Sequence, residues 1–100
     1  MPLKIRHTLQ ARRDLREIWH HIDQNDTNAA DRQLRRIAEK IIQASQVPML
    51  GRPRPEFGDA LRSFVVGRYV IFHEVEPDIL RVVRVMHSAR DITAEAFDDD

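Results

Sequence analysis

Cysteine is absent from the 100-residue sequence, which excludes disulfide bonds, zinc–thiolate sites and thiol catalysis and is compatible with a reducing compartment. Glycine is scarce, and Gly51, Gly58 and Gly67 are too far apart to form a glycine-rich phosphate-binding loop. No stretch approaches the roughly 18 apolar residues of a membrane-spanning helix, and the first residues lack the apolar run of a signal peptide. We therefore predict a cytoplasmic protein that does not insert into membranes.

Net charge is also absent, because 16 basic residues balance 16 acidic ones. The balance is uneven along the chain: residues 92–100 hold four acidic residues and no basic one, so residues 1–91 carry a net charge of +4. Most basic residues are arginine, which suits bidentate contact with phosphate or carboxylate groups. We predict a single domain over residues 1–97 with an arginine-rich surface, followed by a disordered acidic tail over residues 98–100.

The first half of the sequence predicts a short strand and two helices. Residues 1–8 alternate apolar and charged side chains, as in a strand with one buried face. Thr8 is a residue type that caps helices, and apolar residues recur at helical spacing from there to Ile22. The break at residues 25–28 is short, so a second helix that starts near Thr27 is expected to fold back on the first as a helical hairpin.

The second half predicts a loop and three strands. Three of the five prolines and two of the three glycines fall in residues 48–58, which favours a loop. Residues 61–66 and 69–75 have strand patterns and are joined by a Gly-Arg pair that suits a type II′ turn. Residues 79–87 form a third, longer strand with apolar side chains at most positions, as expected for an interior strand covered on both faces.

Strict alternation in the third strand predicts which side chains share a face. We expect one face to hold Leu80, Val82, Arg84 and Met86, and the other Arg81, Val83 and Val85. We expect residues 88–97 to form either a short helix or a segment without regular secondary structure. The fold class is therefore α+β in the order β-α-α-β-β-β, with a helical hairpin packed on a small, mainly antiparallel sheet.

Candidate metal ligands are few. Glu17, His20 and His21 have helical spacing, but the two histidines point about 100° apart on a helix and no third inward ligand is evident, so we predict no metal site and no cofactor. Polar residues from the loop, the hairpin and the last strand form a larger set that we predict to face a target or a phosphate group. Its members are Arg52, Arg62, Arg68, Tyr69, Arg84, His87 and Arg90.

RNA cleavage is one reaction that part of this set would support. If antiparallel pairing brings Glu56, His87 and either Arg68 or Arg62 to one sheet edge, the carboxylate would take the proton from a 2′-hydroxyl and the histidine would protonate the leaving 5′-oxygen. The arginine would stabilise charge on the phosphoryl group. A structural interpretation stays open beside this one: Glu56 pairs with a neighbouring arginine, and His87 forms a turn with Arg90 and Asp91.

Five short motifs span nearly the whole chain. The first is Thr8 with residues 11–18, in the pattern Thr-x-x-Ala-x-x-Asp-Leu-x-Glu-Ile. The others are Gly51-Arg52-Pro53, Leu61-Arg62, Tyr69-Val70-Ile71-Phe72 and Arg84-Val85-Met86-His87-Ser88-Ala89-Arg90-Asp91. In order and spacing they resemble the ParE/RelE superfamily of toxins from bacterial type II toxin–antitoxin systems. The closing Arg-Val-x-His-x-x-Arg-Asp is similar to the ParE, or plasmid-stabilisation, branch.

This resemblance implies a growth-arresting toxin that an antitoxin encoded beside it, ParD-like or similar, holds inactive. ParE members inhibit DNA gyrase through a gyrase–DNA complex, so the first hypothesis is a non-enzymatic gyrase inhibitor. Ribonuclease members of the RelE type instead cut mRNA on the ribosome, and in one subgroup a glutamate, an arginine and a histidine at places similar to Glu56, Arg68 and His87 carry the chemistry. That subgroup has a tyrosine where this chain has Ser88, so the endoribonuclease is the alternative hypothesis.

An antitoxin partner predicts a toxin–antitoxin hetero-oligomer and a surface that binds the antitoxin. Apolar side chains exceed what a chain of this length covers easily, and a partner helix or an added strand would cover the excess. Acidic residues of that segment would complement exposed arginines. The predicted contacts are Arg12, Arg16, Trp19, Arg35, Arg36, Met49 and Phe57. Burial of the apolar ones in the protein's own core is the alternative.

Overall fold

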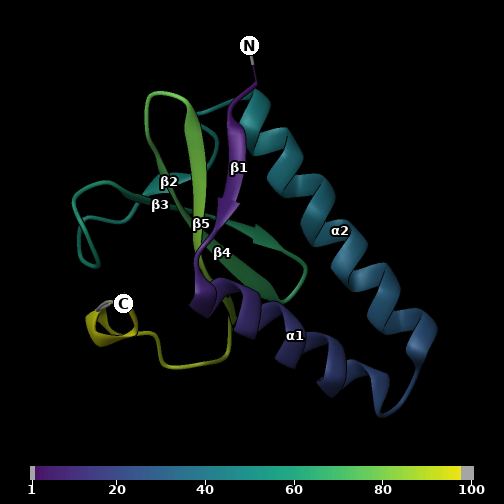
Figure 1. Ribbon diagram of the computed structural model, residues 1–100. Coiled ribbons are helices and arrows are strands. Elements are labelled where there is room, and N and C mark those ends of the chain that lie inside the picture. Colours follow the sequence, from purple (N-terminus) through teal and green to yellow (C-terminus); the bar gives the residue numbers. More distant parts are fainter. Residues whose placement is uncertain (1, 98–100) are drawn as a thin grey trace.

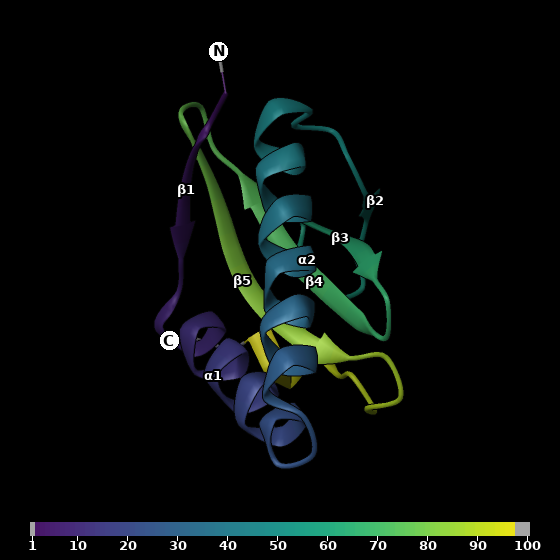
Figure 2. The same cartoon turned by 90° about the vertical axis from the view of Figure 1, so that its right-hand side faces the viewer.

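The computed structural model describes residues 2–97 and has two layers, a five-stranded sheet and two helices that cover one of its faces (Figure 1, Figure 2). The predicted α+β class and the order of its elements are confirmed. The acidic tail predicted over residues 98–100 lies outside the described residues. Neither helix in the described part is long and apolar enough to cross a membrane.

The strand order in the sheet is β1-β5-β4-β3-β2. The strands are β1 (Lys4–His7), β2 (Arg52–Pro53), β3 (Leu61–Val66), β4 (Tyr69–Val75) and β5 (Ile79–His87). β1 pairs with β5 in parallel, and the other pairs are antiparallel. β5 is thus an interior strand, as predicted. The two-residue β2 was not predicted, because its proline-rich segment indicated a loop. Proline has no N–H to donate inside a sheet, and β2 accordingly pairs only at the sheet edge.

Both helices begin at a capping side chain. They are α1 (Leu9–Asp23) and α2 (Thr27–Gln46). The Thr8 hydroxyl accepts a hydrogen bond from the Ala11 N–H at 3.0 Å, and the Asp26 carboxylate accepts one from the Ala29 N–H at 3.2 Å. Each cap of this kind stabilises a helix by about 1 kcal/mol. A short turn joins the helices into the predicted hairpin (Figure 1).

The main core lies between the helices and the sheet. α2 contributes Ile37 and Ile41, and the sheet contributes Ile71, Leu80 and Val82, all of them buried. Burying one such side chain stabilises the fold by roughly 1.5–3 kcal/mol. The helical hairpin is therefore held on the sheet mainly by apolar contact.

A bulge in β5 shifts its register against β4. The pair Phe72–Arg84 is followed by the pair His73–Val82, so Val83 has no residue opposite it in β4. An extra residue in one strand reverses the face that the following side chains reach. The pattern of faces therefore changes at this point of β5.

The bulge separates residues that were predicted to share a face. Leu80 and Val82 lie in the main core under the helices, whereas Met86 lies in a second cluster on the opposite face. Val85, predicted to point away from Val82, packs in the same core. The predicted faces of β5 are wrong because uninterrupted alternation was assumed, and a bulge leaves no clear mark in an apolar run.

A smaller cluster covers the second face of the sheet. Phe72 of β4 packs against Phe57 of the loop before β3 and against Phe97, with ring centroids 5.9 and 4.8 Å apart. Phe97 ends a short 3-10 helix, η1 (Ala94–Phe97), which is one of the two outcomes predicted for residues 88–97. The C-terminal segment is thereby fastened to the sheet by aromatic packing.

Candidate functional site

A cleft of about 270 Å³ opens between α1 and the ends of β4 and β5, and we call it the α1–β5 cleft. It lies at the end of the sheet where β5 finishes and the β3–β4 turn begins. Its lining includes buried apolar side chains and the buried carboxylate of Asp14, together with exposed polar side chains. Its lining residues are Asp14, Glu17, Ile18, His21, Tyr69, Val85, Met86, His87 and Arg90. Three of the residues predicted to face a target are among them.

Tyr69 and His87 are directly opposite one another in the β4–β5 register. Their rings meet edge to face, with centroids 5.3 Å apart. His87 Nδ1 accepts a hydrogen bond from the Ala89 N–H at 3.0 Å, so the neutral imidazole carries its proton on Nε2. The Arg68 carbonyl accepts a hydrogen bond from the Ser88 N–H at 2.7 Å, which ties the β3–β4 turn to the exit of β5. The structure thus brings Arg68, Tyr69 and His87 together.

α1 supplies two cleft residues that the sequence analysis did not assign to a target site. Glu17 and His21 are one helical turn apart, so both reach the same wall of the cleft. Their spacing of four residues was the signal for a shared face, but it was weighed only for metal binding. His20 is not part of the lining and instead packs edge to face on Trp19, with centroids 5.3 Å apart. Within residues 2–97 no three potential ligands are grouped to hold a metal ion.

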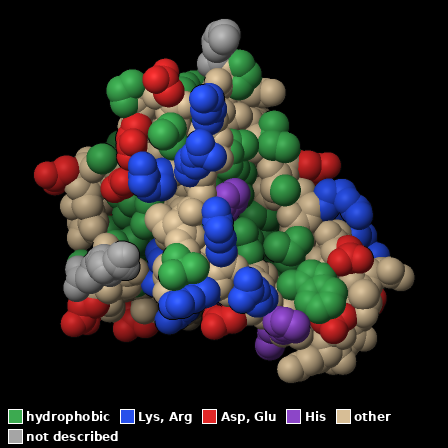
Figure 3. Space-filling view, viewed as in Figure 1, with side chains coloured by type: hydrophobic (Ala, Val, Ile, Leu, Met, Phe, Trp, Pro, Cys, Tyr) green, Lys and Arg blue, Asp and Glu red, His purple; other side chains and the backbone are tan. Residues whose placement is uncertain are grey.

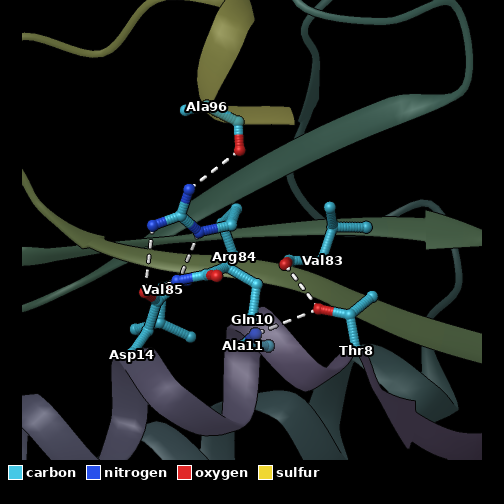
Figure 4. A network of polar contacts seen from close by, with 8 residues as sticks. All are labelled: Thr8, Gln10, Ala11, Asp14, Val83, Arg84, Val85 and Ala96. Carbon is cyan, nitrogen blue, oxygen red and sulfur yellow. Dashed lines mark hydrogen bonds and ion pairs between the residues drawn. The ribbon is translucent and has the colours of Figure 1, made fainter. Parts of the chain in front are cut away.

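Arg84 was predicted to face a target, and this prediction is wrong. The side chain is buried beneath α1, where its Nε and Nη2 donate to the two carboxylate oxygens of Asp14 at 2.7 and 3.0 Å (Figure 4). The remaining Nη1 donates to the Ala96 carbonyl at 2.8 Å. A guanidinium that is buried and paired with a carboxylate in this way has a structural role and is not presented to a phosphate at the surface.

The same network completes the edge of β5 beyond the end of β1. The Asp14 carboxylate accepts the Val85 N–H at 3.0 Å, and the Thr8 hydroxyl donates to the Val83 carbonyl at 2.8 Å (Figure 4). Side chains of α1 therefore satisfy backbone groups that a neighbouring strand would otherwise pair. Thr8, Asp14 and Arg84 belong to the motifs that carried the resemblance, and the structure gives all three a structural role.

Glu56 does not join Arg68 and His87. It lies in the loop before β3, whereas Arg68 lies in the turn after β3, so the two are at opposite ends of a six-residue strand, which has a length of about 17 Å. Figure 1 shows that loop and the β3–β4 turn on opposite sides of the sheet. Glu56 accepts a hydrogen bond from Arg54 Nε at 2.8 Å, and this bond holds the pKa of the exposed carboxyl below its ordinary value. The predicted convergence is wrong, and the alternative pairing with a neighbouring arginine is confirmed.

Two other predicted target residues sit away from the cleft. Arg52 is exposed in β2, at the far edge of the sheet. Arg62 Nη2 donates to the carbonyls of Met49 and Gly51 at 3.0 and 2.9 Å and thereby holds the loop after α2. Arg62 thus has a structural role that its position in the sequence did not indicate. Arg90 is exposed at the rim of the cleft.

The predicted antitoxin contacts divide into exposed and internal residues. Four arginines and Met49 are exposed: Arg12, Arg16, Arg35, Arg36 and Met49. Trp19 is half-buried, and its Nε1 donates to Asp31 Oδ1 at 2.9 Å, which links the two helices. Phe57 packs in the second cluster under the guanidinium of Arg54, 4.9 Å from its ring centroid. For Phe57 the structure therefore supports the alternative of internal packing, whereas Trp19 is not among the residues of either core cluster.

Comparison with known proteins identifies the family of this chain. A model of the family described as the ParE toxin of type II toxin–antitoxin system, parDE, matches residues 5–92. The chain is thus a toxin of the type II toxin–antitoxin class. It belongs to the ParE toxin family. None of the curated proteins compared with it is significantly similar in sequence.

Two solved structures resemble the whole fold. One comes from the chromosomal ParDE toxin–antitoxin system of P. aeruginosa, with 19% identity, a TM-score of 0.71, and coverage of 85% of this chain and 95% of that one. The other comes from the toxin–antitoxin complex RelBE2 of Mycobacterium tuberculosis, with 23% identity, a TM-score of 0.69, and coverage of 87% and 99%. At these identities the likeness shows a shared fold.

Proposed function

We propose that this toxin inhibits DNA gyrase by binding to it and catalyses no reaction of its own. Membership of the ParE family supports the proposal. The observation that carries it is the separation of Glu56 from Arg68 and His87, because that arrangement removes the predicted base from the other two groups of the ribonuclease mechanism.

The surface proposed to bind gyrase is the α1–β5 cleft and its rim. Arg68 and Arg90 are exposed beside the cleft, and His87 is half-exposed in it. Buried apolar side chains, Ile18 and Val85 among them, form part of its lining. An apolar pocket with a charged rim is the usual form of an interaction hot spot, in which a few anchor residues carry most of the affinity.

A supercoiling assay with purified gyrase and relaxed plasmid tests this proposal. We expect the toxin to inhibit supercoiling and His87→Ala to raise the half-inhibitory concentration at least about tenfold, as for a hot-spot residue. Arg32→Ala, an exposed change on α2 away from the cleft, is the matched control and keeps full inhibition. Normal supercoiling at excess toxin, together with prompt translational arrest in cells, would reject the proposal.

A ribosome-dependent endoribonuclease is the second candidate, and one feature of the cleft favours it. Glu17, His21 and His87 line the same cavity as Arg90, so acid, base and phosphate-stabilising groups are present there even without Glu56. Primer extension on mRNA from toxin-expressing cells decides between the two. New 5′ ends that His87→Ala abolishes would favour the endoribonuclease.

We further propose that a cognate antitoxin binds and neutralises this chain in a hetero-oligomer in the cytoplasm. Both similar structures are described as toxin–antitoxin systems or complexes, which supports such a partner. Co-expression with the small protein encoded beside the toxin gene, followed by size-exclusion chromatography, tests the partnership. Failure to form a stable complex would reject it.

A further inference from the structure

The outer edge of β1 is a free strand edge. β1 is the last strand of the sheet on its side, and Figure 2 shows no other strand beyond it. The N–H groups of Lys4 and Thr8 donate to the carbonyls of Asp78 and Val82, at 2.9 and 3.0 Å, so this set of backbone groups faces β5. Because backbone groups alternate along a strand, those of Ile5 and His7 face the other way.

Outside the sheet pairing itself, no backbone hydrogen bond within residues 2–97 involves the N–H of Ile5 or His7, and the alternation turns both groups away from β5. At the upper end of the strand, the Leu3 N–H does find a partner, the Ser45 carbonyl near the end of α2, at 2.9 Å. Residues 5–7 are therefore the open part of this edge. Natural proteins usually cover such an edge, because it is a ready template for an incoming strand.

The side chains around this edge define the kind of strand it fits. Lys4 and Arg6 are exposed on β1, and Figure 3 shows Lys and Arg side chains in a column over β1 and the start of α1. Arg12, exposed near the start of α1, adds positive charge close to His7, and burial followed by this charge lowers the pKa of that histidine. The local field is thus positive and attracts acidic side chains.

Apolar surface lies beside the basic column. Figure 3 shows hydrophobic side chains on the α2 side of the column. Ile42 is 49% exposed and precedes Ser45 by three positions, so the two share a face of the helix; the Ser45 carbonyl accepts the N–H of Leu3, the residue just before β1. A strand laid along β1 would therefore meet positive charge on one of its sides and apolar surface on the other.

We infer that the outer edge of β1 binds an extended segment of the antitoxin as an added strand, with acidic side chains against Lys4 and Arg6. The inference rests on the antitoxin partnership proposed above. The segment would pair with the N–H and C=O groups of Ile5 and His7 and extend the sheet to six strands. The backbone pairing supplies affinity, and the acidic side chains speed association and set the register.

Residue-resolved amide hydrogen exchange tests the inference on the full chain, alone and bound to the purified small protein encoded beside its gene. We expect the Ile5 and His7 amides to exchange at least about tenfold more slowly in the complex. The Val65 amide, near the opposite edge of the sheet, is the matched control. The Arg54 N–H donates to the Leu61 carbonyl, so the backbone groups of Leu61 face outward from β3. Those of Val65, four residues further along the strand, face the same way. Its exchange is expected to stay unchanged.

A charge reversal gives a second, independent readout. Arg6→Glu is an exposed change and is expected to weaken the complex at least about tenfold, whereas Arg32→Glu on α2 leaves its affinity within about twofold. A complex that forms without slower exchange at Ile5 and His7, or with slower exchange at Val65 instead, overturns the inference and leaves the partnership standing. If no complex forms, the proposed partnership fails and the inference fails with it.

Discussion

Asp14 and Arg84 form a buried ion pair between residues that are 70 positions apart in the chain. Two hydrogen bonds in a fork join the carboxylate to the guanidinium, and the carboxylate also accepts the Val85 N–H. The pair fixes α1 against β5, and the third hydrogen bond of the guanidinium, to the Ala96 carbonyl, fixes the C-terminal segment. The walls of the α1–β5 cleft are thus held by one polar network.

Removing one partner of this pair is expected to be costly. Arg84→Met leaves the Asp14 carboxylate buried without its counter-charge, and we expect the free energy of unfolding to fall by about 3–5 kcal/mol. Urea unfolding followed by circular dichroism measures the loss. Arg90→Met, an exposed change, is the control and should alter stability by less than about 0.5 kcal/mol. An equal effect of the two substitutions would contradict the structural role of Arg84.

His73 predicts a dependence of stability on pH. The imidazole is fully buried in β4, and burial, followed by the charge of Arg62, lowers its pKa to about 4. Because the unfolded state binds the proton more tightly, this contribution to stability is fully present above about pH 6.5 and is lost as the pH falls toward 4. The loss has a slope of at most about 1.4 kcal/mol per pH unit.

Unfolding at pH 7, 6 and 5 checks this expectation. His73→Leu removes the group and should flatten the curve relative to the parent protein. The pKa of His7 is lowered too, so the residual slope of the variant includes that residue, and the difference between the two curves isolates His73. Parallel curves would show that His73 does not titrate as stated.

The fold was largely predictable because the apolar patterns, the turn residues and the helix cap in the sequence all indicate the same elements. The bounds of β3, β4 and β5 follow from apolar patterns between clear turn signals, and Thr8 marks the start of α1 through its own side chain. The bulge at Val83 was not predictable, because it depends on how β5 pairs with β4 and with α1 rather than on the residues of β5 alone.

The site was less predictable than the fold. Arginines that bind a target and arginines that bind the protein's own carboxylates look the same in a sequence, and Arg84 was assigned to the wrong group. The sequence allowed Glu56 to meet His87 because strand ends can lie close together, but the length of β3 keeps the two apart. Glu17 and His21 reach the cleft only because α1 is oriented by Asp14, a contact that no local pattern reveals.

Gly51 is expected to be intolerant of any side chain. Its φ of 88° lies in the left-handed region, and a Cβ would come within 2.5 Å of the Ser63 carbonyl oxygen of the neighbouring strand. We therefore expect Gly51→Ala to destabilise the fold by about 2 kcal/mol or more, from backbone strain and the displacement of β2 from β3. Gly58→Ala is the control, because its Cβ meets only Leu61 Cβ at 3.6 Å. The two melting temperatures give the comparison.

Two glutamates separate the proposed mechanisms in cells. Under gyrase binding, neither carboxylate has to accept a proton, so Glu17→Gln and Glu56→Gln should both arrest growth upon induction about as fast as the parent. Under RNA cleavage within the cleft, Glu17→Gln removes the candidate base and should slow mRNA cleavage by about 100-fold or more, whereas Glu56→Gln, outside the cleft, should not. Growth curves with matched expression levels, read together with primer extension, measure both effects. Loss of growth arrest in Glu56→Gln alone would contradict both mechanisms, because Glu56 is exposed and paired only with Arg54.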